Sequence, residues 1–482
     1  MHGLTKRLIS SERFIFIVLS VFVILRFPSL FEPYWYGDEG IYQIIGASLN
    51  QGRELYSGIW DNKPPLFFLL YALFQGNQFV ARLASLAVGL LTIVIFFSLG
   101  KRLLGHIPAF ISTLVFAISY GSPYLEGNIA NTENFMLLPT VLGMYVTYRF
   151  LKRDLKHSDV LILFAIGILL GLSFSMKVVG IFEYGAVCVL LFLYRKTIVE
   201  SLRKVSIVTL GFITPFLLFT IYYTLQGLLV PYMQSVLFVN ISYVGHGNYF
   251  LIPQGLLFFK VILLTISIAS IYLFRQKLSQ NLSFLLVWLG FALFSSFFSQ
   301  RSYTHYILLS LPSMVLLGGY LFSHLRKYRI HLIAYLFLLV FLIIYFKPYP
   351  VAKTVSYYGN FLTYLAGFQD TVSYQSFFDS RVPRDYQIAS YLDMKLKPYE
   401  EVFIWSNSAQ IYVLSETLPI GRYSVAYHII SNDAYGETQH ALNTKKPRFI
   451  VITQDEPFQG LSLHDYTYRM SLNNTRIYER TF

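Results

Sequence analysis

The sequence predicts a polytopic, all-α membrane protein that carries a C-terminal α/β domain outside the membrane. Of its 482 residues, 55% are hydrophobic and only 13% are charged, whereas about 25% of the residues of a soluble domain carry charge. Long apolar runs follow one another as far as residue 347. From residue 348 they stop, and charges of both signs appear. Such a chain is expected to cross a bilayer many times before it ends in a polar domain.

About eleven apolar segments are candidate spans; a span takes roughly 20 helical residues, or fewer where the helix is buried among its neighbours. They are residues 14–31, 79–100, 106–121, 134–151, 159–176, 178–194, 205–224, 255–274, 282–299, 304–322 and 330–347. The first follows a basic start, as a signal peptide does, but no small-residue cleavage site follows it. We therefore expect it to remain as the first span.

The distribution of Lys and Arg predicts the orientation of these spans. With the N-terminus inside, the cytoplasmic segments are basic at every step: 1–13, 101–102, 149–156, 195–204, 275–277 and 326–329. Positive charge on the inner side is the rule for multi-pass proteins. An odd number of spans then places the C-terminus outside, and the plasma (inner) membrane is the expected location. Topology thus explains the net charge of +13, and no nucleic-acid partner is expected.

The chain divides into two predicted domains. Residues 1–347 form the transmembrane domain, which includes a polar first outer loop at 32–66, and residues 348–482 form the outer domain. In the outer domain, strands are expected at 401–405, 421–427 and 447–453 and helices at 384–396 and 433–443, an alternation typical of α/β folds. The apolar loop 225–254 is expected to lie along the membrane surface. The single cysteine, Cys188, is interpreted as a packing residue.

The first outer loop carries an acidic pair, Asp38-Glu39, a few residues after the first span. Neighbouring helical residues point about 100° apart, so the two acids are expected to have different roles. One can face a substrate while the other pairs with a cation or a backbone group. The alternative is that both only stabilise the start of a helix near Gly40, where acids suit the helix dipole.

The same loop ends in Trp60-Asp61-Asn62-Lys63-Pro64-Pro65-Leu66. Pro64 restricts Lys63 to an extended backbone, and a lysine presented at the outer membrane face suits a phosphate group. The alternative is a lysine that extends to lipid headgroups.

Further charges lie in other outer loops. Glu126 and Glu133 are the charges of the second loop, where Asn131 or Thr132 can cap the following helix. Glu133 can otherwise bind a metal ion or orient an acceptor. Cations recur at the outer ends of later spans, at Lys177 and at Arg301 in the segment Arg301-Ser-Tyr-Thr-His305-Tyr306. His305 is either a packing residue or part of the same site.

Acids and cations at one membrane face suit sugar transfer from a lipid phosphate. The cations hold the phosphate and stabilise it as it leaves, while a carboxylate takes the proton of an attacking hydroxyl. A glycine-rich phosphate loop of the usual kinds is not found.

The motifs that carry these residues resemble the GT-C membrane glycosyltransferases. They are Asp38-Glu39, DNKPPL, Asn131-Thr132-Glu133-Asn134, the span that ends in Ser-Met-Lys177, and RSYTHYILLSLP. The resemblance is to the bacterial branch related to protein O-mannosyltransferases and to the aminoarabinose transferases of lipid A, glycosyltransferase families 39 and 83. It covers most of the chain, and more loosely the segments IWSNSAQIY and GRY of the outer domain.

The resemblance implies an inverting glycosyltransferase that moves a sugar from a polyprenyl-phosphate donor to a hydroxyl on the outer face. It implies Asp38 as the base, Glu39 in support and Glu133 as a further acidic residue. The donor phosphate is expected at Lys63, Lys177 and Arg301. The remaining candidate contacts are Asp61, Asn131, His305 and Tyr306. The acceptor, which can be a lipid, a glycan or a protein, stays open, and so does a divalent metal ion, since both vary across the family.

Two other functions are weighed. A transporter or flippase of envelope lipids or glycans usually has ionisable residues at the bilayer midplane and matching halves. Here the acids lie in loops, and the halves do not match. A scaffold that has lost activity is the second alternative, with the outer domain binding a partner or a cell-wall polymer.

Overall fold

The computed structural model describes residues 14–153, 159–194, 197–252, 254–397 and 399–481. Its internal contacts divide the chain into two compact units. The helical unit contains the residues up to Ser29, together with Arg82–Leu229 and Val236–Val355; the mixed unit contains Leu30–Ala81, Val230–Ser235 and the chain from Ser356 onward. By sequence position the first outer loop belongs with the spans, whereas its contacts group it with the C-terminal segment.

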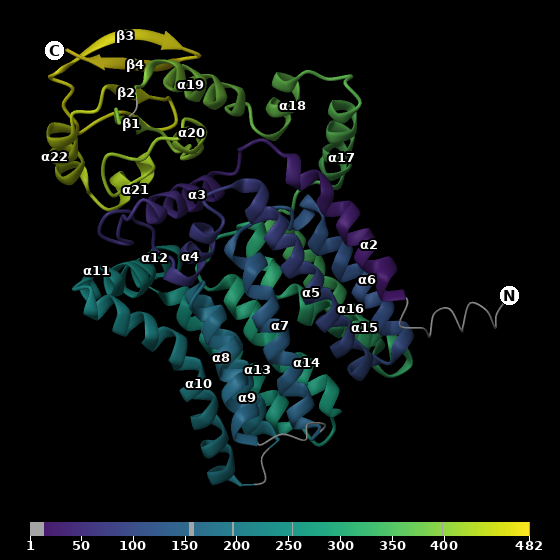
Figure 1. Ribbon diagram of the computed structural model, residues 1–482. Helices are drawn as coiled ribbons and strands as arrows, with labels where there is room; N and C mark the ends of the chain where they lie inside the picture. The colour runs from purple at the N-terminus through teal and green to yellow at the C-terminus, as the bar shows by residue number, and fades with distance from the viewer. Residues whose placement is uncertain (1–13, 154–158, 195–196, 253, 398, 482) are drawn as a thin grey trace. The chain divides into compact units, whose positions relative to one another are not determined.

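The helical unit is a set of long apolar helices that run beside one another (Figure 1). They are α2 (Phe14–Arg26), α5 (Gln78–Leu104), α6 (His106–Gly121), α7 (Thr132–Leu151), α8 (Asp159–Phe174), α9 (Ile181–Leu193), α10 (Ile198–Leu225), α13 (Gly255–Leu273), α14 (Gln280–Phe297), α15 (Leu311–Ser323) and α16 (Leu325–Phe346). The apolar loop after α10 folds into α11 (Leu229–Met233), a π-helical turn (Gln234–Phe238) and α12 (Val239–Gly247).

Six helical segments in the described part of the chain are long and apolar enough to cross a membrane. They are Phe14–Phe31, Gln78–Leu104, Ile198–Leu225, Gly255–Leu273, Gln280–Phe297 and Leu325–Phe346. Shorter apolar helices cover His106–Gly121, Asp159–Phe174, Val178–Leu193, Leu229–Gly245 and Leu311–Ser323. Each segment expected to span the membrane therefore overlaps one of these helices or α7. The number of crossings and their orientation stay predictions.

Glycines bring α8 and α10 into close contact. A Cβ atom on Gly167 would lie 2.2 Å from the carbonyl oxygen of Val208, and one on Gly171 would lie 2.4 Å from that of Phe212. Hydrocarbon around a helix is as apolar as its side chains, so helices in a membrane associate through close packing and small residues. The Gly-x-x-x-Gly spacing of α8 supplies that contact.

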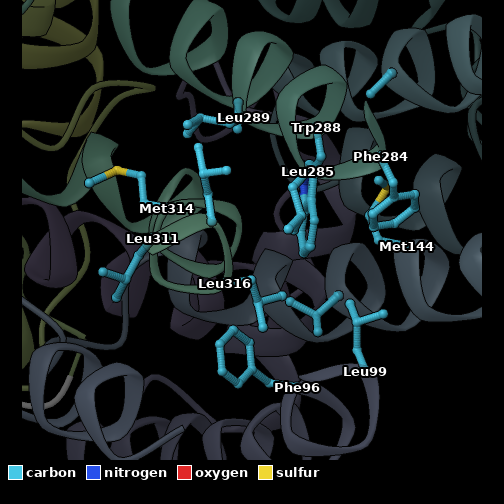
Figure 2. Close-up of a cluster of buried hydrophobic side chains, with 14 of the residues drawn as sticks. Phe96, Leu99, Met144, Phe284, Leu285, Trp288, Leu289, Leu311, Met314 and Leu316 are labelled. Atoms are coloured by element: carbon cyan, nitrogen blue, oxygen red, sulfur yellow. The ribbon is translucent and has the colours of Figure 1, made fainter. Parts of the chain in front are cut away.

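The centre of the helical unit is filled by side chains from α5, α7, α14 and α15. Figure 2 shows Phe96 and Leu99 of α5 near Leu316 of α15, with the Trp288 side chain of α14 extending toward them. Phe96 stacks on Phe116 of α6 with ring centroids 4.3 Å apart. These residues belong to one continuous cluster of buried apolar side chains that joins the helices of this unit.

The mixed unit combines short helices with a four-stranded sheet (Figure 1). Its elements are α3 (Gly37–Asn50), α4 (Pro65–Leu73), α17 (Val351–Leu365), α18 (Thr371–Phe378), α19 (Val382–Lys395), β1 (Val402–Trp405), α20 (Gln410–Leu414), α21 (Ala426–Ser431), α22 (Tyr435–Lys445), β2 (Phe449–Ile452), β3 (Tyr466–Leu472) and β4 (Thr475–Arg480). The strand order is β1-β2-β4-β3, with β1 and β2 parallel and the other pairs antiparallel.

Most of the expected C-terminal elements are confirmed. The strands at 401–405 and 447–453 are β1 and β2, and the two expected helices are α19 and α22. The strand at 421–427 is wrong: the Arg422 carbonyl accepts a hydrogen bond from the Trp60 N–H at 2.9 Å, and α21 begins at Ala426. The β3–β4 hairpin was not expected, although its turn residues, Asn473 and Asn474, tolerate the positive φ angles of 46° and 60° that they adopt.

Candidate active site

Asp38 and Glu39 lie in the first turn of α3, which begins at Gly37. The Glu39 side chain is buried, whereas Asp38 is half-buried. Their different exposure follows from the helical offset between neighbouring residues. Their position also suits the helix dipole, so a capping contribution is compatible with a chemical role for Asp38.

A tyrosine joins Asp38 to the lysine of the Lys-Pro-Pro segment. The Tyr42 hydroxyl donates to Asp38 Oδ2 at 3.1 Å, and Lys63 Nζ lies 4.8 Å from the centroid of the Tyr42 ring. Asp61 Oδ1 is 3.4 Å from Lys63 Nζ and accepts the Lys63 backbone N–H at 3.1 Å. We call Asp38, Tyr42, Asp61 and Lys63 the loop cluster.

The backbone around Lys63 is held on both sides. The Tyr56 hydroxyl donates to the Lys63 carbonyl at 2.8 Å. Pro64 is the extended N-cap residue of α4, with φ −61° and ψ 155°, and Pro65 is its first residue. A proline costs no hydrogen bond at that position and presets the helical φ angle. The Lys-Pro-Pro sequence therefore fixes where the lysine side chain leaves the backbone.

The C-terminal segment completes the surroundings of this loop. The Trp60 indole N–H donates to Ser235 Oγ at 2.9 Å, and the Trp60 ring meets the His428 ring edge to face, with centroids 5.0 Å apart. At the start of α3, a Cβ atom on Gly40 would lie 2.7 Å from the side chain of Gln410. A side chain at position 40 would therefore have to displace the Gln410 side chain of α20.

A second cluster lies in the helical unit, around Glu133. Asn131 is the N-cap of α7, and its side chain accepts the Asn134 backbone N–H at 3.3 Å. The cap places Glu133 in the first turn, where its side chain is 2% exposed and forms an ion pair with Lys177. Lys177 Nζ also lies 4.1 Å from the centroid of the Tyr306 ring.

His305 joins two acidic residues in this cluster. Its Nδ1 lies 2.8 Å from Glu126 Oε2, and its Nε2 lies 4.0 Å from Glu133 Oε1. Glu126 adopts a left-handed conformation with φ 56°, at the end of a short turn after Pro123. We call Glu126, Glu133, Lys177, His305 and Tyr306 the bundle cluster.

Arg301 lies at the edge of the same unit. Its guanidinium stacks on the Tyr243 ring, with 5.3 Å between the guanidinium carbon and the ring centroid. Tyr243 in turn interacts with Tyr306. Arg301 is thus connected to the bundle cluster through aromatic rings.

The structure groups the predicted residues in two sets. Asp38, Asp61 and Lys63 come together in the mixed unit, and Glu133, Lys177, His305 and Tyr306 come together in the helical unit. The expectation that Lys63, Lys177 and Arg301 bind the same donor phosphate stays a prediction.

Sequence reasoning missed Tyr42 and His428. Tyr42 follows Asp38 by four residues, which puts the two side chains on the same helical face, so this signal was available. The sequence around His428 gives no signal of a site, because only the folding of the chain brings His428 to Trp60.

The metal ion that the family resemblance left open stays open. Within the described ranges, no three His, Cys, Asp or Glu side chains are placed to hold a metal ion together.

Comparison with known proteins supports the resemblance drawn from the motifs. Residues 62–223 match the family model described as dolichyl-phosphate-mannose-protein mannosyltransferase. A search of curated protein sequences gives no significant match.

Solved structures share the fold over almost the whole chain. ArnT from Cupriavidus metallidurans bound to undecaprenyl phosphate is 15% identical, with a TM-score of 0.58 over 97% of this chain and 98% of ArnT. The apo form of ArnT gives 14% identity and a TM-score of 0.57 over 96% and 97% of the two chains.

The oligosaccharyltransferase AglB from Archaeoglobus fulgidus, in complex with an inhibitory peptide and a dolichol-phosphate, is 12% identical, with a TM-score of 0.47 over 92% of this chain and 70% of AglB. The family match and the shared ArnT fold together confirm the resemblance to the GT-C membrane glycosyltransferases.

Proposed function

We propose that this chain, which has the fold of a GT-C membrane glycosyltransferase, transfers a sugar from a polyprenyl-phosphate donor to a hydroxyl group of an acceptor. Transfer takes place on the outer face of the plasma (inner) membrane and inverts the anomeric configuration. The observation that carries this proposal is the loop cluster. In it the Tyr42 hydroxyl donates to the half-buried Asp38 carboxylate, and the Tyr42 ring contacts the ammonium group of Lys63.

The proposed reaction begins at Asp38. Its carboxylate takes the proton of the acceptor hydroxyl as that oxygen attacks the anomeric carbon of the donor sugar. The bond between the anomeric carbon and the phosphate oxygen breaks, and its electron pair leaves with the polyprenyl phosphate. General base catalysis of this kind contributes roughly 10²- to 10⁴-fold to the rate.

The leaving phosphate is assigned to the cations. Lys63 binds the donor phosphate from the first outer loop. The family resemblance assigns Lys177 and Arg301 to the same phosphate. Positively charged groups stabilise the negative charge that develops on a leaving phosphate, and they do so most strongly in sites shielded from water. Support for the proposal comes from undecaprenyl phosphate in the ArnT structure, whose fold this chain shares.

The remaining candidate residues have supporting roles: Glu39, Asp61, Asn131, Glu133, His305 and Tyr306. Asp61 and Glu133 hold Lys63 and Lys177 in position, and Asn131 holds the helix that carries Glu133. Glu39 supports the start of α3 next to the base. His305 and Tyr306 face Glu133 and Lys177 and are proposed substrate contacts.

The test is a transfer assay with the purified protein in lipid nanodiscs. A panel of polyprenyl-phosphate-linked sugars with labelled sugar groups is incubated with envelope lipid, glycan and protein fractions. We expect one donor to lose its label to a fraction while free polyprenyl phosphate accumulates in equal amount. If labelled donor lipid instead moves across the bilayer of proteoliposomes and no sugar is transferred to an acceptor, the protein is a flippase.

A further inference from the structure

His428 connects the C-terminal segment to the first outer loop, next to the loop cluster. It lies on the short helix α21, and its ring contacts Trp60, the residue before Asp61, at a centroid distance of 5.0 Å and an angle of 88°. The Trp60 backbone is tied to the same segment through the Arg422 carbonyl, 2.9 Å away. This contact is therefore fixed by backbone and side chain together.

One nitrogen of this imidazole, Nδ1, has no hydrogen-bond partner among the described residues. His428 is only 7% exposed, and Nδ1 itself is buried. A neutral imidazole offers one donor and one acceptor, and buried polar groups are nearly always paired. A buried imidazole nitrogen without a partner, close to charged residues, is a candidate position for a polar ligand group.

An exposed aromatic residue stands next to it. Tyr427 is 36% exposed, and its ring centroid lies 4.4 Å from that of His428. The Tyr427 backbone N–H is held by Asn407 Oδ1 at 3.1 Å. A sugar offers both kinds of group that such a pair can bind, since its hydroxyls donate and accept hydrogen bonds and its C–H face packs on aromatic rings.

We propose that Tyr427 and His428 form a sugar-binding subsite beside the Asp61–Lys63 pair, in which the His428 imidazole hydrogen-bonds to a sugar hydroxyl and the Tyr427 ring packs against the sugar. The assignment rests on the proposed function, because it places the subsite next to the lysine assigned to the donor phosphate. The sugar is that of the donor or that of a glycan acceptor.

The charge state of His428 agrees with this role. Burial lowers the pKa of His428 to about 4, with Lys63 acting in the same direction and Asp61 and Asp38 in the opposite one. The imidazole is therefore neutral at physiological pH, and it keeps one donor and one acceptor for a hydroxyl.

The experiment measures binding of two probes by nanodisc-embedded full-length protein. The probes are polyprenyl phosphate alone and the polyprenyl-phosphate-linked sugar that the wild type uses. His428→Phe keeps a ring against Trp60 but removes both nitrogens, and His428→Gln restores a donor and an acceptor. His440→Phe is the matched control, because His440 is exposed on α22. Thermal melting of every variant reports its folding.

If the subsite binds the donor sugar, His428→Phe weakens binding of the sugar-bearing probe by about tenfold, the effect of one lost hydrogen bond, and leaves polyprenyl phosphate binding unchanged. If it binds the acceptor, both probes bind as before and the KM for the acceptor rises instead. In either case His428→Gln recovers part of the loss, and His440→Phe has no effect.

Two results would overturn the assignment. One is unchanged binding of both probes together with an unchanged acceptor KM; the other is an equal loss for both probes, which a purely structural role produces. Failure of the proposed function looks different: the wild type itself then binds neither probe, and the subsite assignment falls with it.

Discussion

At the scale of single residues, aromatic rings hold the cations of both clusters. Lys63 Nζ lies 4.8 Å from the ring centroid of Tyr42, and Lys177 Nζ lies 4.1 Å from that of Tyr306. A ring face attracts an ammonium group by about 0.5–2 kcal/mol and leaves its charge in place. Each lysine is thereby positioned between an aromatic ring and a carboxylate, that of Asp61 for Lys63 and that of Glu133 for Lys177.

Tyr42 has two separable contacts, which predicts different results for two substitutions. Tyr42→Phe removes the hydroxyl that donates to Asp38 but keeps the ring under Lys63, so we expect kcat to fall by roughly tenfold or more, as for a lost hydrogen bond to a charged group, with unchanged binding of polyprenyl phosphate. Tyr42→Leu also removes the ring, and we expect that binding to weaken. Steady-state kinetics and probe binding measure the two effects. Identical behaviour of both variants would contradict these separate roles.

His428 predicts a pH dependence of stability. Burial lowers its pKa to about 4, whereas an unfolded histidine has a pKa of about 6.5. Between these values the unfolded state binds a proton that the folded state does not. The stabilisation from a neutral His428 is therefore complete above about pH 6.5 and is lost as the pH falls toward 4, by an amount on the order of 3 kcal/mol.

Melting temperatures measured from pH 7 to pH 4 test this dependence. The difference in melting temperature between wild type and His428→Phe is expected to shift in favour of the variant as the pH falls, because the variant has no group to protonate there. Parallel curves for the two proteins would show that His428 is not buried in its neutral form.

At the scale of elements, local sequence signals predicted the helix starts well. Asn131 caps α7, and the two prolines after Lys63 open α4, both as their residue types require. The segment 421–427 failed for a physical reason: a short apolar run with a tyrosine resembles a strand, but its backbone hydrogen-bonds to Trp60 instead of to a neighbouring strand. The secondary structure of such short runs depends on tertiary contacts, which a single sequence does not show.

Because α8 and α10 are in close contact, we expect even a methyl group added at their interface to lower the stability of the protein. In Gly167→Ala the new Cβ would lie 2.2 Å from the Val208 carbonyl oxygen, so the helices must separate. We expect a loss of about 1–3 kcal/mol, as for overpacked cores, measured as a lower melting temperature in detergent. Gly290→Ala in α14 is the control, because its nearest neighbour, Leu264 Cδ1, lies at an ordinary 3.6 Å. Equal effects of the two substitutions would contradict close packing between α8 and α10.

At the scale of the whole molecule, the sequence predicted a helical membrane protein with a small C-terminal sheet, and it predicted most members of both clusters. It could not predict that the first outer loop and the C-terminal segment form one compact unit. That grouping depends on contacts between residues far apart in the chain, such as Trp60 with Arg422 and with His428. Hydropathy and motifs report local properties and carry no information about such contacts.

Because the family resemblance implies that Lys63 and Lys177 bind the same donor phosphate, we expect their substitutions to cause the same defect. Lys63→Ala and Lys177→Ala are each expected to weaken binding of polyprenyl phosphate by about tenfold, since each removes one charged contact. Lys395→Ala, at an exposed position on α19, serves as the control. Normal binding of the same probe by Lys177→Ala would remove the bundle cluster from the phosphate site.

The base role of Asp38 is tested most directly by Asp38→Asn in a single-turnover transfer assay with the donor already bound. Asparagine keeps the shape of the side chain and cannot take the acceptor proton. We predict that donor binding is retained, that transfer falls by at least roughly 10²-fold, and that Asp433→Asn, at an exposed position, transfers as the wild type does. Near wild-type transfer by Asp38→Asn would show that Asp38 is not the base.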